Sequence, residues 1–483
     1  MIKYILTLSL LYSFLFSLDN NVLVKIKDEV ITRNDFIKRA EYTIRPAYCK
    51  SSNQIHKKII LNSLIAEKLM ALDINEYIGS DNFSSNFLEG IKEQKMREVF
   101  LDEKVYNKIN IDADVLLSHI SNSTKTYNVN FINISNDTTI SAINYLLDNG
   151  EGFDRICKEY LGLEEIPSKS VDYFSENDPI IINNIFNQEY MPGDIIGPMV
   201  AKDKSVLFVR IIDWVDKPLI TDSERKNHKN LILQKLNEIE QIDIYDKFIV
   251  DMMKGYKVKF LEKPFFAIAD KAYQFYILKN VASNDHSSTG EFDLIEFSKD
   301  LNMDINESFL EINKQSFSIE YIDNLISKHP LLFRSEKISM RDFPLYFKYA
   351  IVDLLRDEQM TQIAYADKYD NHIQVVKEYN LFRGASLSAL HLKALLDRNN
   401  IPPGDYNDDP ELIINNLLND YVDTLQTKYS DYISIDFDLL DDITLTHIDS
   451  YAYKKGVPYP MVVPLFPLLT NRHTIDYGKP INF

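Results

Sequence analysis

The sequence has 483 residues, of which 45% are hydrophobic, so it can bury sizeable cores and divides at ordinary domain sizes into roughly two to four domains. The formal net charge is −19, and this field repels phosphate backbones and anionic lipid headgroups. Nucleic acid is therefore not an expected partner. Only 13 glycines accompany 29 tyrosines and 27 phenylalanines, which leaves little scope for glycine-rich phosphate loops.

The N-terminus has the layout of a signal peptide. Lys3 precedes an apolar run from Ile5 to Phe16, and the small residue Ser17 follows it. The run is shorter than the roughly 20 residues that a membrane-spanning helix needs. We therefore predict a signal peptide over residues 1–18 and an exported protein, with the periplasm as the favoured compartment. A retained membrane anchor is the alternative.

The next part of the chain, residues 19–124, is predicted to begin with a hairpin and to continue as helices. Alternating apolar residues over 22–26 predict a strand, and residues 30–31 return it. Thr32 and Asp35 form a capping pair, in which the threonine oxygen accepts an N–H of the first helical turn. Further helices are expected at the apolar stripe of Leu61, Ile65, Leu69 and Leu72, over Phe87–Asn107, and from Asp112 through Ile120.

Residues 125–217 predict a small α+β domain. The segment "YNVNFINIS", which begins at Tyr127, alternates as a strand, and "ISAINYLLDNGEGFDRICKEYLG" gives two short helices around Gly150 and Gly152. "SVLFVRIID" then provides a closing strand. The expected order is strand, helix, helix, strand, which is an α+β arrangement.

The rest of the chain is predicted to be mainly helical. Thr221 and Glu224 form a capping box for a long helix, and "YKVKFL" after Gly255 is a short strand. "KISMRDFPLYF" at Lys337 echoes the earlier "VITRNDFIKRA", which suggests a related helical module. The expected segments are a long helix and return strand over 218–264, an unassigned region over 265–335 with a polar linker at 282–291, a helical module over 336–450, and a proline-rich extended tail over 451–483.

No metal, cofactor or disulfide is assigned from the sequence. The segment from Asp300 to Glu311 has acidic spacing similar to a calcium loop, but Ile305 replaces the glycine that the sharp turn needs. The histidines are scattered, without the spacing of a zinc site. An oxidising compartment permits a disulfide between Cys49 and Cys157, whereas the spacing equally allows two unpaired buried thiols.

The order of these parts resembles the SurA and PrsA group of exported folding factors over roughly the first 260 residues. In that family a helical chaperone module leads into a parvulin-type (PpiC-type) peptidyl-prolyl isomerase domain. "NGEGFDRICKEY" matches the family's helix through Gly152 and Phe153, and "IFNQEYMPGDIIGPMV" supplies Gly193, Gly197 and Pro198. The resemblance implies a multidomain α+β fold: a SurA-N-like helical module, a degenerate parvulin-like α+β domain, and a mainly helical C-terminal half.

The departures from the family concern its chemistry. The family's two histidines fall at Phe131 and Leu207, so no catalytic residue is assigned and efficient isomerase activity is not expected. The apolar pocket that binds proline would survive as a peptide-binding cleft. The resemblance places peptide binding at Phe174, Ile181, Phe186 and Met199.

The sequence therefore predicts an exported, ATP-independent folding chaperone without a cofactor or metal. Its expected partners are unfolded or extended polypeptides of the envelope or of the secreted fraction, bound by apolar burial and backbone hydrogen bonds. An active peptidyl-prolyl cis-trans isomerase is one alternative. An envelope scaffold, which would dock an assembly partner through its proline-rich tail, is another.

Overall fold

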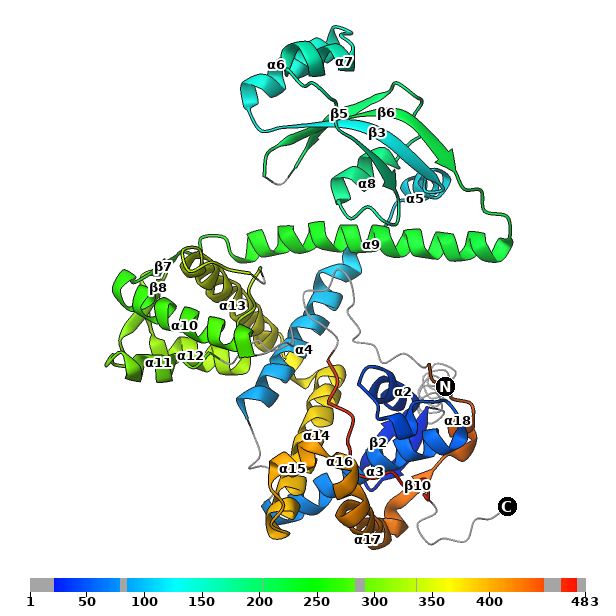
Figure 1. Cartoon of the computed structure of the whole chain (residues 1–483), viewed down its shortest axis with the longest axis vertical. Coiled ribbons are helices and arrows are strands. Elements are labelled where there is room, and N and C mark those ends of the chain that lie inside the picture. Colours follow the sequence, from blue (N-terminus) through cyan, green and yellow to red (C-terminus); the bar gives the residue numbers. More distant parts are fainter. Residues whose placement is uncertain are drawn as a thin grey trace, which may run out of the picture. The chain divides into compact units, whose positions relative to one another are not determined.

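The computed structural model describes residues 21–78, 85–201, 203–282, 292–335, 337–446 and 462–475 (Figure 1). The chain divides into two compact units. We call Lys104–Met252 the inserted unit, and Met1–Glu103 together with Met253–Phe483 the discontinuous unit. Helices dominate both, with three small antiparallel sheets, which confirms the predicted multidomain α+β class. The predicted signal peptide and nearly all of the predicted linker at 282–291 lie outside the described residues.

One of the two sheets described in the discontinuous unit joins segments from its two parts. Strands β1 (Val22–Ile26) and β2 (Glu29–Thr32) form the predicted hairpin, and β10 (Ile433–Ile435) pairs antiparallel with β1 to give the order β10-β1-β2. Val24 lies opposite Ile435, and Ile26 lies opposite Ile433. The hairpin therefore takes its third strand from a segment that lies about 400 residues later in the sequence.

Three helices follow the hairpin: α2 (Arg33–Glu41), α3 (Gln54–Ile78) and α4 (Asn86–Lys104). The predicted capping box is present, because the Thr32 side chain accepts from the Asp35 amide while the Asp35 side chain accepts from the Thr32 amide. Every residue from Ile59 to Ala71 is buried. Helix α3 is thus a core helix enclosed on all sides, rather than a surface helix with one apolar stripe.

The region after Met253 contains the part that the sequence left unassigned. Strands β7 (Val258–Phe260), β8 (Ser308–Ile312) and β9 (Gln315–Ser318) form an antiparallel sheet in the order β7-β8-β9. The rings of Phe265, Phe309, Phe343 and Phe347 are buried in its core. The helices around this core are α10 (Glu262–Ala282), α11 (Leu294–Asp300), α12 (Ile319–Lys328) and α13 (Phe343–Ala366).

The C-terminal helices complete the core around α3. Residues from both ends of the chain, Leu23 and Phe36 with Val422 and Phe466, belong to the same buried cluster. The helices are α14 (Ile373–Arg398), α15 (Pro403–Asp408), α16 (Pro410–Ile413), α17 (Asn419–Tyr429) and α18 (Phe437–Asp441). Short turns of helix lie at η1 (Ala47–Cys49), η5 (Tyr369–Asn371), η6 (Ile414–Leu418) and η7 (Ser430–Tyr432).

The inserted unit contains a four-stranded antiparallel sheet in the order β4-β3-β6-β5. The predicted order of strand, helix, helix, strand was incomplete, because it omitted two strands and a helix. The polar segment "SKSVD" of β4 gives no alternating signal, since only Val171 in it is buried. The elements are η3 (Tyr106–Lys108), α5 (Ala113–Asn122), β3 (Lys125–Ile134), α6 (Asp137–Asp148), α7 (Phe153–Arg155), η4 (Ile156–Tyr160), β4 (Ser168–Asp172), α8 (Pro179–Ile185), β5 (Ile195–Val200), β6 (Val206–Asp216) and α9 (Asp222–Met252).

Helices cover both faces of this sheet (Figure 1). Ile132 and Phe208 pack on one face with residues of α6, α7 and η4. Tyr127 and Val129 pack on the other face with residues of α5, α8 and α9. Helix α9 begins at the predicted capping box of Thr221 and Glu224. Among the described residues, no helix is long and apolar enough to cross a membrane.

Candidate functional site

The predicted peptide-binding residues of the inserted unit are mostly core residues. Ile181, Phe186 and Met199 are buried in the cluster beneath α8, and Phe186 is 0% exposed. The Phe186 ring meets the Tyr173 ring edge-on, with centroids 5.0 Å apart. Phe174 differs, because it is 38% exposed and its ring packs against His228 at 5.3 Å. Of the four predicted residues, only Phe174 is placed at the surface.

The two positions at which the family carries histidine lie on neighbouring strands. Phe131 of β3 is opposite Val209, and Leu207 of β6 is opposite Asn133, so both side chains point to the same face of the sheet. Both are partly buried against the cluster beneath α8. That cluster also contains Ile232 and Leu236 of α9, so the face is packed by the chain's own helices.

Three polar atoms in the same core, His119 Nδ1, Tyr127 Oη and Tyr173 Oη, have no hydrogen-bond partner among the residues that the structure describes. The His119 and Tyr173 rings meet edge-on at 5.7 Å. Burial lowers the pKa of His119 to about 4 and raises the pKa of Tyr127 to about 12. Burial also raises the pKa of Tyr173. All three side chains are therefore neutral at pH 7, and they contribute packing rather than charge to the core.

An open groove lies instead in the discontinuous unit. A cavity of about 350 Å³, which we call the helical cavity, is lined by α2, α4, α14 and residues 462–463. A second cavity of about 730 Å³, the hairpin cavity, is lined by β2, α2, α3 and α14. Asn34, Asp35, Arg39, Lys377 and Leu381 line both cavities. The two cavities therefore adjoin, and we call them together the groove.

Exposed apolar side chains mark the rim of the groove. Ile373, at the start of α14, is 76% exposed, and Val376 and Val30 are also exposed. Exposed Phe87 packs edge-on against Phe382 of the helical cavity, with ring centroids 6.1 Å apart. Exposed apolar side chains beside a groove are typical of an interaction surface.

Ion pairs neutralise the cations of the hairpin cavity. The Arg39 guanidinium donates to both carboxylate oxygens of Glu67, at 2.8 and 2.7 Å, and both side chains are buried. Lys68 pairs with Glu29 at 2.7 Å, and Lys377 pairs with Asp35 at 3.0 Å. Because each of these cations has a carboxylate partner, the hairpin cavity has little reason to select an anionic ligand.

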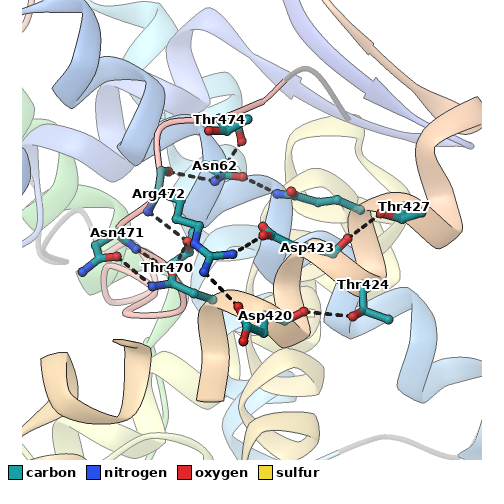
Figure 2. Close-up of polar contacts among 11 residues, drawn as sticks. Asn62, Asp420, Asp423, Thr424, Thr427, Thr470, Asn471, Arg472 and Thr474 are labelled. Carbon is teal, nitrogen blue, oxygen red and sulfur yellow. Dashed lines mark hydrogen bonds and ion pairs between the residues drawn. The ribbon is translucent and has the colours of Figure 1, made fainter. Parts of the chain in front are cut away.

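An extended segment of the chain itself, residues 462–475, runs from the groove across α3 and α17, and we call it the strap (Figure 2). Residues 462–475 have neither helix nor strand. Side chains of other elements donate to five of its main-chain carbonyls. These hydrogen bonds join Arg39 to Leu465 O (2.8 Å), Tyr406 to Leu468 O (2.9 Å), Ser63 to Thr470 O (3.0 Å), and Asn62 to Arg472 O (2.8 Å) and to Thr474 O (3.5 Å).

Side chains of the strap are fixed as well. The Arg472 guanidinium pairs with Asp420 at 2.8 Å and also with Asp423, both on α17 (Figure 2). The Thr470 hydroxyl donates to the Asn419 side chain at 2.7 Å. Phe466, Leu469 and Ile475 are buried in the core around α3. The strap is thus an integral layer of the discontinuous unit.

No cluster of histidine, cysteine and carboxylate side chains in the described ranges could hold a metal ion. Cys49 and Cys157 are both buried, the first in the discontinuous unit and the second in the inserted unit, and no disulfide joins these two described residues. Burial raises the pKa of the Cys157 thiol.

Comparison with known proteins does not assign a family. No family model matches the chain, and no curated protein matches it significantly. A crystal structure of the foldase protein PrsA from Lactococcus lactis aligns over 48% of this chain and 92% of that chain, at 14% identity and a TM-score of 0.17. These values are too low for the alignment to support an argument about fold or function, so the foldase resemblance remains a prediction from the sequence.

The groove and the strap contacts were not predicted from the sequence. One signal was available at Glu67, an acidic residue within the apolar run "LIAEKLMAL". A charge at the centre of a core helix needs a buried partner, which here is Arg39. The identity of that partner and the position of the strap depend on contacts between distant parts of the chain.

Proposed function

We propose that this protein is an exported, ATP-independent chaperone that holds unfolded envelope or secreted polypeptides, with the groove of the discontinuous unit as its binding site. The observation that carries the proposal is an open groove with an exposed apolar rim beside an extended segment held through its main chain. An unfolded client offers the same two features, apolar side chains and unpaired backbone groups.

The strap supports this proposal because it shows how side chains of the discontinuous unit hold an extended polypeptide through its main chain. Its carbonyls are held by side-chain donors of α2, α3 and α15, and a carbonyl is common to every residue of every polypeptide. The part of the recognition that uses carbonyls alone does not depend on the sequence of the bound segment. A hairpin cavity whose cations are already paired and whose rim is apolar suits clients with varied sequences.

The alternative functions receive less support. A prolyl isomerase needs an accessible apolar pocket for the proline ring, whereas Ile181, Phe186 and Met199 are buried. An assembly tail needs to be available to a partner, whereas the described part of the tail is docked on α3 and α17. We therefore place client binding in the discontinuous unit and propose no catalytic role for the inserted unit.

The test is suppression of aggregation of an unfolded outer-membrane protein by the purified protein. We expect the wild type to suppress aggregation, and the double variant Ile373→Ser with Val376→Ser to lose most of this effect, because each change removes exposed apolar surface at the groove rim. Leu332→Ser is the matched control, since Leu332 is equally apolar and exposed but does not line either cavity.

Two results would overturn the proposal: a wild type that leaves aggregation unchanged, or a rim variant that suppresses it as well as the wild type does. A proline-peptide isomerisation assay on the same samples addresses the alternative. A rate that is lost in Phe174→Ala but kept in the rim variant would favour the isomerase.

A further inference from the structure

The outer edge of β2 faces the groove and has no strand partner in the part of the chain that the structure describes. The sheet order is β10-β1-β2, which leaves β2 at the edge. An edge strand presents unpaired N–H and C=O groups, which form a template for another extended chain. Most proteins block such an edge, yet here it borders the 730 Å³ hairpin cavity.

The register of the hairpin identifies Val30 as the residue that presents its main chain to this edge. A two-residue turn at Lys27 and Asp28 closes on the pair Ile26 and Glu29. In such a turn the two flanking residues are hydrogen-bonded to each other, so Ile26 and Glu29 form a hydrogen-bonded pair. Along an antiparallel pair of strands, hydrogen-bonded and non-hydrogen-bonded residue pairs alternate. At the next pair, Lys25 with Val30, the amide and carbonyl of Val30 therefore point away from β1.

The next amide of β2 that points away from β1 already has a hydrogen-bond partner. Two residues beyond Val30, the Thr32 N–H donates to the Asp35 carboxylate at 3.1 Å within the capping box. This contact agrees with the alternation, because Thr32 is the next position whose main chain points outward. The unused part of the edge is thus centred on Val30.

The shape of the hairpin cavity suits an added strand. All five consecutive residues 28–32 line it. Since successive side chains of a strand point to opposite faces, a cavity that touches all five runs along the edge rather than over one face. Ile373 and Val376 of α14 add exposed apolar side chains to the lining of the same cavity, where they can receive side chains of the incoming segment.

The groove already holds an extended polypeptide at its other end. Val462 and Val463 of the strap line the helical cavity, and Arg39, which lines both cavities, donates to the carbonyl of Leu465. The hairpin cavity is therefore continuous with a surface that binds extended main chain. This continuity indicates the occupant, an extended client segment with aliphatic side chains on one face.

We propose that a client segment binds as an additional β-strand on the outer edge of β2, hydrogen-bonded to the amide and carbonyl of Val30, with its apolar side chains against Ile373 and Val376. This inference rests on the proposed chaperone function and specifies how its groove holds a client. Binding by strand addition depends on the backbone of the client, so it tolerates many client sequences.

The first experiment uses Val30→Pro in the full chain. Proline removes only the N–H that points to the edge, and an edge strand tolerates proline at such a position. The probe is a fluorescent peptide of alternating valine and threonine with terminal lysines. We expect about tenfold weaker binding than in Val30→Thr, which keeps the amide and serves as the matched control. Equal affinity in two variants that unfold at the same temperature would overturn the inference.

The second experiment leaves the protein unchanged, so it is decisive even if Val30→Pro fails to fold. Two peptides carry N-methyl groups on alternate amides, one set on each edge of the extended peptide. Strand addition predicts that one set weakens binding about tenfold and that the other binds like the parent peptide. Equal affinities of the two peptides, or equal losses, would overturn the inference.

The failure of the inference and the failure of the proposed function are distinguishable. If neither peptide binds and aggregation is not suppressed, the proposed chaperone function itself fails. If aggregation is suppressed but the two N-methylated peptides bind alike, only binding by strand addition fails.

Discussion

The two units differ in how they use their apolar side chains. The inserted unit contains the positions that the family resemblance assigns to peptide binding, and three of them, Ile181, Phe186 and Met199, are buried in its own core. The discontinuous unit leaves comparable side chains, such as Ile373 and Val376, exposed beside a groove. An aromatic or aliphatic residue at a pocket position can therefore either pack in the core or contact a ligand, and its burial distinguishes the two roles.

The two units can be followed separately in solution, because the sequence has one tryptophan, Trp214 in β6. Its ring lies 6.1 Å from that of Tyr127 in the core of the inserted unit. Tryptophan fluorescence therefore reports on the inserted unit, whereas far-UV circular dichroism reports on the helices of both. The three predictions that follow use this difference.

The largest expected effect concerns the inserted unit. Phe186→Ala removes a fully buried ring that packs against Tyr127 and Tyr173, and should lower the free energy of unfolding of this unit by about 3–5 kcal/mol. Phe174→Ala, at the surface, should lower it by less than about 1 kcal/mol. Urea unfolding followed by Trp214 fluorescence measures both. Similar losses in the two variants would contradict the assignment of Phe186 to the core.

The second prediction concerns pH and the same unit. The pKa of His119 is about 4 in the folded protein because of burial, and about 6.5 in the unfolded chain. A group with a lowered folded pKa stabilises fully above its unfolded pKa, so stability should fall as the pH decreases from about 6.5 to about 4, by about 3 kcal/mol in all.

Fluorescence-detected unfolding at pH 7 and pH 4.5 measures this change. The variant His119→Phe keeps a ring against Tyr173 but has no titrating group, so it should lose most of this dependence. A variant that keeps the full pH dependence would assign it to other groups.

The smallest expected effects are in the discontinuous unit. Gly90 of α4 lies against the end of α12, where an added Cβ would stand 2.0 Å from the Lys328 carbonyl oxygen. Gly90→Ala should therefore destabilise the discontinuous unit by about 1–3 kcal/mol. At Gly384, inside α14, an added Cβ meets only the Lys68 ammonium nitrogen at 3.7 Å.

Gly384→Ala should accordingly stabilise the unit by about 0.5–1 kcal/mol, because alanine favours a helix over glycine. Circular dichroism should show the two shifts in opposite directions, with the Trp214 transition unchanged in both variants. A shift of the same sign for Gly90→Ala and Gly384→Ala would contradict the close contact at Gly90.

The elements that depend on neighbouring residues were predictable from the sequence. The capping boxes at Thr32 and Thr221 are local patterns, and both are present. The apolar periodicity that identified α3 was also local, although its complete burial was not. Strand β4 was missed because its polar sequence lacks alternation, and it forms through pairing with β3.

The groove could not be predicted for a different reason. Its walls come from residues near 30, 91, 376 and 462, and no local pattern relates these segments to one another. The pairing of β1 with β10 is equally distant in sequence. The motif residues that carry the family resemblance lie in the inserted unit. The resemblance therefore predicted a binding site there and predicted nothing about the strap.

Because β1 pairs with the distant β10, the discontinuous unit cannot complete its fold until late in synthesis. Helix α3 and the hairpin lie in the first 78 residues, whereas Val422, Ile433 and Phe466, which complete their core, lie near the end. The inserted unit is contiguous and can close on itself as soon as Met252 has emerged. The amino-terminal segment must instead wait, with the apolar surface of α3 uncovered, until residues 422–466 arrive. A chain for which we propose a role in protecting unfolded polypeptides thus passes through an incompletely covered state itself during its own synthesis.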